Sequence, residues 1–288
     1  MGAILDQTNV VLTGLPRSGT TLTCHLLNKL PNTVALHEPI APGKFADLEG
    51  EDAILDGVER FFKRMRRMAL DRGEIVSKHV DGEVPANSYR QAKSEGGLRS
   101  PIAEKGKRKG RIAVQKDLRR DFLLVIKSPA MFSALLPTLV KRFPAYAIIR
   151  NPLSILASWN SIDHNLQGGH SPAAERYDER LRGELTSIEG GTERQLYLLS
   201  WWYDQFRRTL PDASILRYED IVGSGGKALS AITPAAEGLA EPLESQNLNA
   251  AYDHKRMREL GSGLLDREGA YWRFYTRESV AKLVEGLG

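Results

Sequence analysis

Short apolar runs alternate along the chain with longer stretches in which hydrophobic positions recur every three or four residues. The β-branched run 9–13 and the apolar run 33–36 predict buried strands, and the leucine spacing over 20–30 predicts a helix between them. Apolar positions at helical spacing over 51–70 predict a second helix, whose opposite face is basic.

The alternation of strands and helices resumes after residue 120. It predicts a strand at 122–126, a helix at 130–142, a strand at 145–149, a helix at 152–162, a polar loop at 163–190, a helix at 191–209 and a strand at 214–216. Strands that are apolar throughout and alternate with helices are typical of a parallel sheet covered on both faces. We therefore expect an α/β fold of three layers, with a central parallel sheet flanked by helices.

Residues 80–120 interrupt this pattern. The stretch is rich in Gly, Ser, Lys and Arg and has little periodicity, so we interpret it as an irregular basic insertion. No internal repeat and no strong linker divides the chain, and we expect residues 1–288 to form a single domain that carries this insertion.

Composition narrows the classes of function only modestly. The 288 residues include 40 Lys plus Arg and 36 Asp plus Glu, a net charge of +4 that is compatible with an anionic ligand and gives no reason to expect nucleic acid. Cys24 is the single cysteine, which excludes an intrachain disulfide, and the six histidines show no metal-ligand spacing. We therefore expect no metal site. No apolar run approaches the length of a membrane span, so we expect a cytoplasmic protein.

The segment Gly14–Thr21, GLPRSGTT, lies between a predicted strand and a predicted helix, the context in which a phosphate-binding loop occurs. Glycines let successive backbone N–H groups turn toward an anion, and the N-terminus of the following helix adds partial positive charge. The residues that would contact the anion are Pro16, Arg17, Ser18, Gly19, Thr20 and Thr21.

The loop departs from the nucleoside-triphosphatase pattern. Thr20 stands where that pattern has lysine, and the cation is Arg17 inside the loop. Two predicted strands lead into Lys127 and Arg150, where a magnesium-binding carboxylate would be expected. Basic strand ends suit an anionic sulfuryl donor better than ATP with Mg²⁺.

The sequence here resembles the sulfotransferases that use 3′-phosphoadenosine 5′-phosphosulfate (PAPS). GLPRSGTT is similar to their 5′-phosphosulfate loop in its bacterial and tyrosylprotein forms, and residues 147–159 are similar to their 3′-phosphate motif, in which Arg150 and Ser158 stand eight apart. Weaker likenesses are the Tyr-Glu-Asp at Tyr218 and a C-terminal nucleotide-clamping loop containing Arg267 and Gly269. The resemblance spans residues 9–277, leaves 40–120 uncovered, and implies a P-loop-like sulfotransferase fold with PAPS as the donor.

The resemblance also implies the catalytic groups. Glu38, just past the second predicted strand, stands where tyrosylprotein and several bacterial sulfotransferases have their general base. His37 is the alternative, because imidazole titrates near neutrality, and strand alternation would let only one of the two face the site. Lys127, at the end of the strand expected to be central, is the candidate for steadying the leaving oxygen, and Arg17 for the 5′-phosphate and the sulfate.

The acceptor is a hydroxyl compound of unspecified kind. Eleven Lys or Arg lie between residues 90 and 120, densest at 105–111, and these form either an arm that binds an anionic carbohydrate or metabolite or a solvated loop. The sequence is also compatible with Arg150 in a surface ion pair and with Ser158 as a small packing residue. For the whole chain it is compatible with a P-loop kinase or NTPase, or with a non-catalytic binder of a nucleotide or polyanion.

Overall fold

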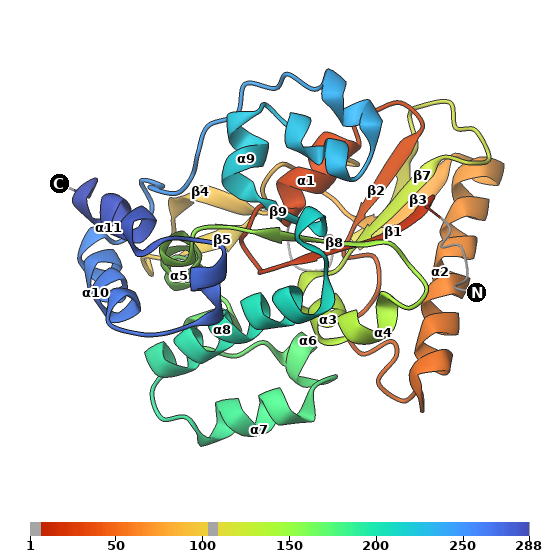
Figure 1. Ribbon diagram of the computed structural model, residues 1–288. Helices are drawn as coiled ribbons and strands as arrows, with labels where there is room; N and C mark the ends of the chain where they lie inside the picture. Colours follow the sequence, from red (N-terminus) through yellow and green to blue (C-terminus); the bar gives the residue numbers. More distant parts are fainter. Residues whose placement is uncertain (1–6, 103–108, 288) are drawn as a thin grey trace.

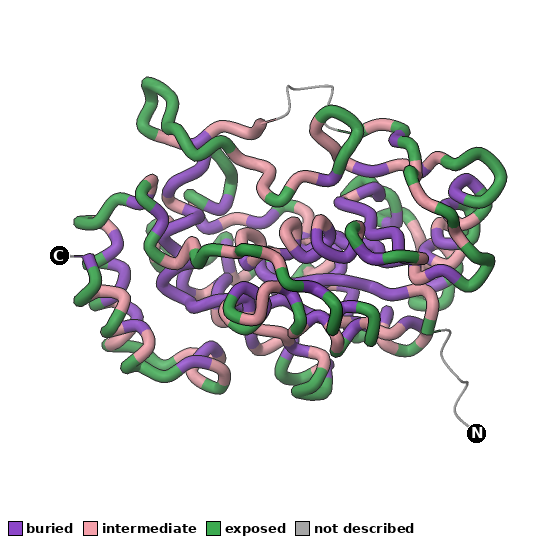
Figure 2. Tube along the Cα trace, turned by 90° about the horizontal axis from the view of Figure 1, so that it is seen from above, coloured by how far each residue is buried: buried purple, intermediate pink, exposed green. Residues whose placement is uncertain are grey.

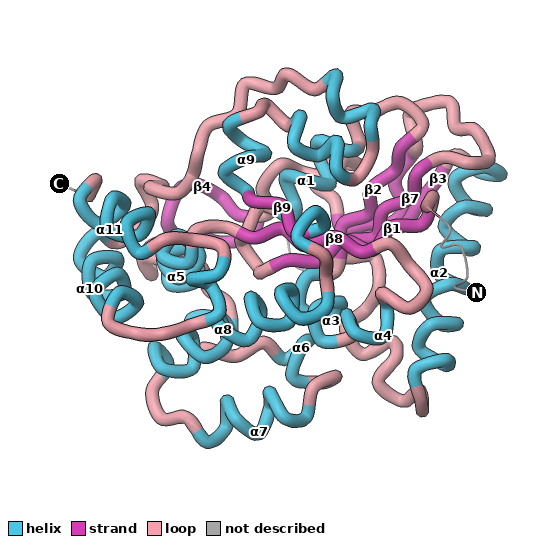
Figure 3. The backbone as a smooth tube through the Cα atoms, viewed as in Figure 1, coloured by secondary structure: helices cyan, strands magenta, loops and turns pink. Residues whose placement is uncertain are grey.

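A five-stranded parallel sheet forms the centre of the computed structural model, which describes residues 7–102 and 109–287. All neighbouring strands in it run parallel, and Figure 3 shows them with helices on both sides. Their order is β2 (Thr33–His37), β7 (Leu123–Lys127), β1 (Asn9–Gly14), β8 (Ala145–Ile149) and β9 (Ile215–Arg217). β1 is therefore the central strand, and the expectation that the strand ending in Lys127 is central is wrong by one position.

Helices cover both faces of this sheet, as the sequence predicts (Figure 1). One face carries α1 (Thr20–Leu27) and α9 (Tyr218–Gly223), and the other carries α3 (Pro129–Ala134), α4 (Leu136–Leu139) and α8 (Gly191–Thr209). The remaining α-helices are α2 (Glu51–Arg72) at the β2 end, α6 (Pro172–Glu175) and α7 (Glu179–Ser187) near α8, and a group of α5 (Pro152–Asn160), α10 (His254–Leu265) and α11 (Arg277–Glu285). The result is a three-layer α/β fold.

The buried side chains explain why the strands could be recognised. Residues of β1, β2, β7 and β8 are almost all buried, because helices shield both faces of the sheet. Figure 2 shows the buried residues gathered in the interior of the molecule. Their apolar side chains join those of the helices in one hydrophobic cluster. A continuous apolar run is the sequence pattern that such a doubly covered strand requires.

The interpretation of residues 80–120 as irregular is wrong where the chain forms the short strands β4 (Tyr89–Lys93), β5 (Arg99–Pro101) and β6 (Lys109–Ala113). β3 (Glu74–Lys78) pairs antiparallel with β6, and β4 pairs antiparallel with β5. β4 and β6 are mostly exposed, and β3 and β5 are short and only partly buried, so their sequences lack the apolar runs that mark strands buried on both faces. The backbone N–H of Arg99 donates to the carbonyl oxygen of Ser161 at 2.8 Å, which ties the second ribbon to the end of α5.

Several further element boundaries differ for local reasons. The predicted loop 163–190 contains α6 and α7, and α7 begins where the Asp178 side chain accepts the Leu181 N–H. The predicted helix 130–142 divides into α3 and α4, with Pro137 in the first turn of the second. Five 3₁₀ helices complete the described elements: η1 (Asn165–Gly168), η2 (Asp212–Ser214), η3 (Lys227–Ala231), η4 (Pro234–Gly238) and η5 (Ala270–Arg273).

The strand order locates the place where a ligand would bind. After β1 the chain crosses to the β2 edge, whereas after β8 it continues to β9 on the opposite side. Ligands of open α/β sheets bind where neighbouring strands connect in opposite directions, at their carboxyl ends. That point lies between β1 and β8, next to the Gly14–Thr21 loop and Arg150. No helix in the described part of the chain is long and apolar enough to cross a membrane.

Candidate active site

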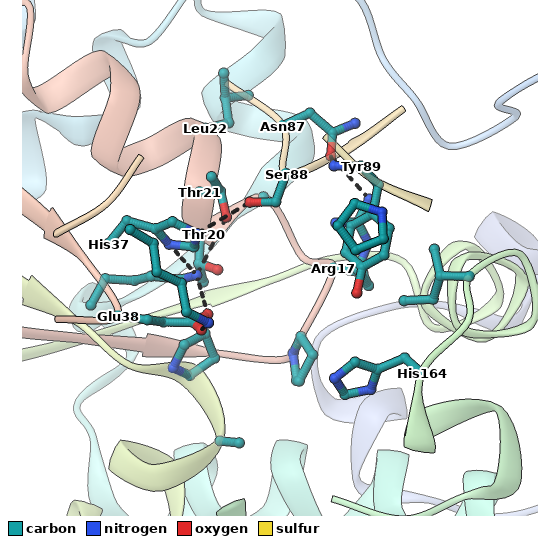
Figure 4. A pocket seen from close by; sticks show the side chains of 18 of the residues that line it. Arg17, Thr20, Thr21, Leu22, His37, Glu38, Asn87, Ser88, Tyr89 and His164 are labelled. Carbon is teal, nitrogen blue, oxygen red and sulfur yellow. Dashed lines mark hydrogen bonds and ion pairs between the residues drawn. The ribbon is translucent and has the colours of Figure 1, made fainter. Parts of the chain in front are cut away.

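A cavity of about 810 Å³ opens at the carboxyl ends of the parallel strands. Its walls come from the loop after β1, from the ends of β2, β7 and β8, from the ribbons between residues 78 and 109, and from residues 243–252. Figure 4 shows two groups of side chains on opposite sides of it. His37 and Glu38 lie on one side, and Arg17 lies with Tyr89 on the other.

The loop between β1 and α1 is held in one conformation by two glycines. Gly14 has φ 145°, and a Cβ there would lie 2.4 Å from the Ile148 carbonyl oxygen of β8. Gly19 has φ 96°, and a Cβ there would lie 2.6 Å from the Tyr218 ring. Arg17 adopts φ 75° without being glycine, a costly conformation that occurs most often at functional sites.

Most of the expected loop residues reach the cavity. Its lining includes Pro16, Arg17, Gly19, Thr20 and Thr21. Ser18 is different, because its hydroxyl is buried and donates to the Ile148 carbonyl oxygen at 2.7 Å. The structure therefore turns the Ser18 side chain into the core, where it joins the loop to β8 and faces away from the cavity.

The two arginines singled out in the sequence lie in contact. Arg17 Nε donates to Ser158 Oγ at 3.2 Å and Nη2 to Asn87 Oδ1 at 3.2 Å, and the guanidinium stacks over Tyr89, 4.7 Å from the ring centre. Arg150 Nη1 donates to the carbonyl oxygen of Arg17 at 3.0 Å, and the Arg150 guanidinium lies 4.6 Å from the ring centre of Tyr218. Arg150 is thus a wall of the cavity, not a surface ion-pair partner.

A third arginine, Arg99 of β5, completes this group. Its side chain is 1% exposed, and its Nε donates to the carbonyl oxygen of Arg90 at 2.8 Å. Within residues 7–102 and 109–287, no carboxylate lies within 4.0 Å of Arg17, Arg99 or Arg150. Burial lowers the pKa of Arg17 to about 10, and the positive charges of Arg99 and Arg150 act in the same direction. Buried cations without a paired acid mark a site for an anion.

Tyr252 lies in the middle of this arginine group. Its hydroxyl is 3.4 Å from Arg150 Nη2, and it also contacts Ser158. Burial alone would raise the pKa of Tyr252, but Arg150, the Ser158 contact and Arg17 outweigh burial and lower it. A buried phenol whose pKa falls reports a strongly positive potential.

Glu219 supports the arginine group without touching it. The carboxylate accepts from the Asn151 backbone N–H at 2.9 Å, from Asn247 Nδ2 at 2.9 Å and from the Tyr275 hydroxyl at 2.7 Å. Asn247 Oδ1 in turn accepts from Arg150 Nε at 2.8 Å. Glu219 is therefore a positioning residue, which holds Arg150 through Asn247.

Lys127 is the centre of the opposite group. Its side chain is 3% exposed, and Nζ lies 2.8 Å from Glu38 Oε1, 3.0 Å from His37 Nδ1 and 3.3 Å from Thr21 Oγ1. Burial lowers the pKa of Lys127 and Glu38 opposes this shift. The ammonium thus connects the phosphate loop with both candidate bases.

Glu38 and His37 both line the cavity, so the expectation that strand alternation would exclude one of them is wrong. The reason is that Glu38 follows the last residue of β2 with φ 45°, which turns its side chain back toward Lys127. Glu38 also forms an ion pair with Lys78 of β3. Burial would raise the pKa of Glu38, but Lys127 and Lys78 hold it well below its usual range.

His37 is held neutral. An ammonium can only donate, so Nδ1 accepts from Lys127 and the ring proton is on Nε2, 3.1 Å from Ser88 Oγ. Burial, reinforced by Lys127, lowers the pKa of His37 to about 3. The side chain is a buried hydrogen-bonding group at neutral pH.

The expected C-terminal clamp does not reach the cavity. Arg267 is ion-paired with Glu193 at the start of α8, with Nη2 2.8 Å from Oε1, and neither Arg267 nor Gly269 is among the lining residues. Residues 246–252, which carry Asn247 and Tyr252, occupy that side instead. Their sequence is polar and aperiodic, and it offered no signal for this role.

The basic stretch divides into separate roles. Arg99 and Lys109 line the cavity, and Lys116 is structural, since its Nζ donates to the carbonyl oxygens of Asn28, Leu30 and Thr33. Residues 105–108 of the densest run lie outside the described residues. No three His, Cys, Asp or Glu side chains in the described chain are arranged to hold a metal ion.

Comparisons with known proteins give structural likeness only. No protein-family model and no curated protein sequence matches the chain. Among solved structures, it is similar to the sulfotransferase STF9 from Mycobacterium avium, with 14% identity, a TM-score of 0.35 and coverage of 98% of this chain and 76% of that one. It is also similar to the sulfotransferase STF1 from Mycobacterium tuberculosis, with 14% identity, a TM-score of 0.34 and coverage of 99% and 78%.

Proposed function

We propose that the protein is a sulfotransferase that moves a sulfuryl group from PAPS to a hydroxyl of a small-molecule or carbohydrate acceptor. The observation that carries the proposal is the arrangement of charge in one cavity. Arg99 and Arg150, both buried, lie on one side with the partly buried Arg17, and none of the three has an acidic partner among the described residues. A Lys–Glu pair lies on the other side, and the Gly14–Thr21 loop joins the two sides.

The residues fit a donor with two anionic ends. Arg150 and Arg99 would hold the 3′-phosphate. Ser158 is fully buried and is not among the lining residues, so it would act by positioning Arg17, whose side chain donates to it while the Arg17 backbone belongs to the loop between the two ends. Gly19, Thr20, Thr21 and Lys127 would hold the 5′ end. PAPS supplies the activated sulfuryl group.

Glu38 is the proposed general base. It is ionised at neutral pH, its side chain is 29% exposed, and it borders the cavity beside the loop. His37 is the weaker candidate because its Nδ1 lone pair is already occupied by Lys127 and because its pKa is about 3. The acceptor oxygen would bond to sulfur as the sulfur bond to the bridging oxygen breaks, its proton would pass to Glu38, and 3′-phosphoadenosine 5′-phosphate (PAP) would leave.

Lys127 links the two halves of this chemistry. Its ammonium is shared with Glu38 before reaction, which keeps the carboxylate a weak base. As negative charge grows on the leaving oxygen, Lys127 would be drawn toward that oxygen, and the loss of its attraction would raise the basicity of Glu38. Positioning and preorganised charge would supply most of the rate.

A labelled-PAPS assay against pooled small molecules, lipids and glycans tests the proposal. We expect one pool to yield a sulfated product whose identification names the acceptor. Turnover of ATP with Mg²⁺ and none of PAPS would instead identify a P-loop kinase or NTPase. Tight PAP binding with no transfer to any pool would identify a non-catalytic binder.

A further inference from the structure

Two lysines face each other across the β3–β6 ribbon at the edge of the cavity. Lys78 and Lys109 are direct partners in the antiparallel register, so both side chains project from the same face, and both line the cavity. Like charges directly opposite each other destabilise an antiparallel pair. An anion bound between them would remove that cost.

The two lysines differ in what they contact. Lys78, at the end of β3, forms an ion pair with Glu38, so the β3–β6 ribbon is in direct contact with the proposed base. Lys109 is exposed, and no carboxylate of the described residues lies within 4.0 Å of it. An anion held by Lys109 would therefore lie close to a hydroxyl that Glu38 deprotonates.

The charges of the donor would be matched by cations other than these two lysines. Arg17, Arg99, Arg150 and Lys127 are the cations proposed to hold the two ends of PAPS. Of the described lining residues, only Glu38 and Glu244 are acidic. Because Lys78 is paired with Glu38, Lys109 supplies the positive charge that remains on the acceptor side of the cavity when the donor is bound.

We propose that the acceptor is itself an anion: a sugar or small metabolite that carries a carboxylate, sulfate or phosphate near the hydroxyl to be sulfated, and that Lys78 and Lys109 bind this group. Naming the occupant as the acceptor rests on the proposed function. The anion subsite itself rests only on the register, on the cavity and on the absence of a carboxylate partner for Lys109 among residues 7–102 and 109–287.

The test is a binding titration of the full-length protein saturated with PAP. The probes are glucose 6-phosphate and glucuronate, compared with neutral glucose. We expect both charged sugars to bind and glucose to bind far more weakly, and Lys109→Ala to weaken the charged probes by about tenfold or more, the scale of one charged hydrogen bond. Lys109→Arg should restore most of the affinity, because it restores the charge.

Arg111→Ala is the matched control. Arg111 lies two residues further along the same strand, lies 3.7 Å from Glu74 in an ion pair and does not line the cavity. Charged sugars that bind Lys109→Ala as well as wild type, or no better than glucose, would overturn the inference.

Different results would contradict the proposed sulfotransferase activity and the proposed anion subsite. Absence of PAP binding, or PAP binding without any sulfuryl transfer, counts against the sulfotransferase. The comparison of wild type with Lys109→Ala can then be made on the protein without PAP, where it still decides whether Lys109 binds the anion.

Discussion

Arg150 donates a hydrogen bond through Nη1 to the backbone carbonyl oxygen of Arg17, at 3.0 Å. The contact joins the end of β8 to the phosphate loop across 133 positions of sequence. It brings the two basic motifs to one wall of one cavity, which is the condition for both to grip a single bis-phosphorylated nucleotide. Arginines on opposite sides of the sheet would have excluded that nucleotide.

Replacing Arg150 should weaken PAP binding. Arg150→Ala removes a buried guanidinium that has no ion-paired acid in the described part of the chain, and we expect a loss of about 1–3 kcal/mol in binding free energy. Isothermal titration with PAP measures it. Equal affinity of variant and wild type would remove Arg150 from the site.

Arg99 and Arg267 provide a second, paired prediction. Arg99→Ala should lower PAP affinity by about tenfold or more, because a buried cation beside Arg17 and Arg150 is lost. Arg267→Ala should leave the affinity unchanged, because its side chain is bound to Glu193 away from the cavity. If Arg267→Ala lowered PAP affinity and Arg99→Ala did not, the C-terminal segment would be the part of the chain that holds the nucleotide.

Glu38→Gln tests the base. The amide keeps the size of the side chain and one accepting oxygen but takes up no proton, so turnover should fall by about 10² or more while PAP affinity stays close to wild type. Steady-state rates with the acceptor found in the pooled assay, together with PAP titrations, separate the two effects. A variant with wild-type turnover would show that another group takes the proton.

His37 should make stability depend on pH. Its pKa falls from 6.5 to about 3 on folding, so below pH 6.5 the unfolded chain binds a proton that the folded chain does not. Stability should therefore decline as pH falls from about 6.5 toward 3, by about 1.4 kcal/mol for each pH unit from this one group.

Urea unfolding at pH 7, 6 and 5 for wild type and His37→Asn measures this contribution. This pH range lies above 4.5, the ordinary pKa of a glutamate. Because folding lowers the pKa of Glu38, its stabilising effect is lost only when the pH falls below that value, so Glu38 adds little to the slope measured here. Parallel slopes for the two proteins would mean that His37 is not buried in its neutral form.

Elements with a strong local pattern could be predicted. The apolar runs of β1, β7 and β8 and the helical spacing of α2 and α8 were recognised because each carries its own signal of burial. The β3–β6 and β4–β5 ribbons were not, because short strands that are exposed or only partly buried are specified by the strand with which they pair, and that strand carries no long apolar run of its own.

The site residues likewise fall into those that a local sequence pattern marks and those that it does not. Arg17, Lys127, Arg150 and Glu38 stand next to strand ends or in a glycine loop, so their place in the fold could be deduced from sequence. Arg99, Lys109 and Tyr252 stand in segments without periodicity, and only chain packing brings them to the cavity. Arg267 shows the converse error, since motif order alone suggested a contact that the fold does not make.

From sequence alone, the parallel α/β architecture, the Gly14–Thr21 loop between a strand and a helix, and the basic strand ends were determined, because each depends on short-range periodicity and on backbone conformations that glycine permits. The tertiary structure alone decided the third arginine, the shared contacts of Lys127 with Glu38 and His37, and the facing pair Lys78 and Lys109. Those features depend on strand register and on backbone turns, such as the positive φ of Glu38, that arise only when distant segments pack together.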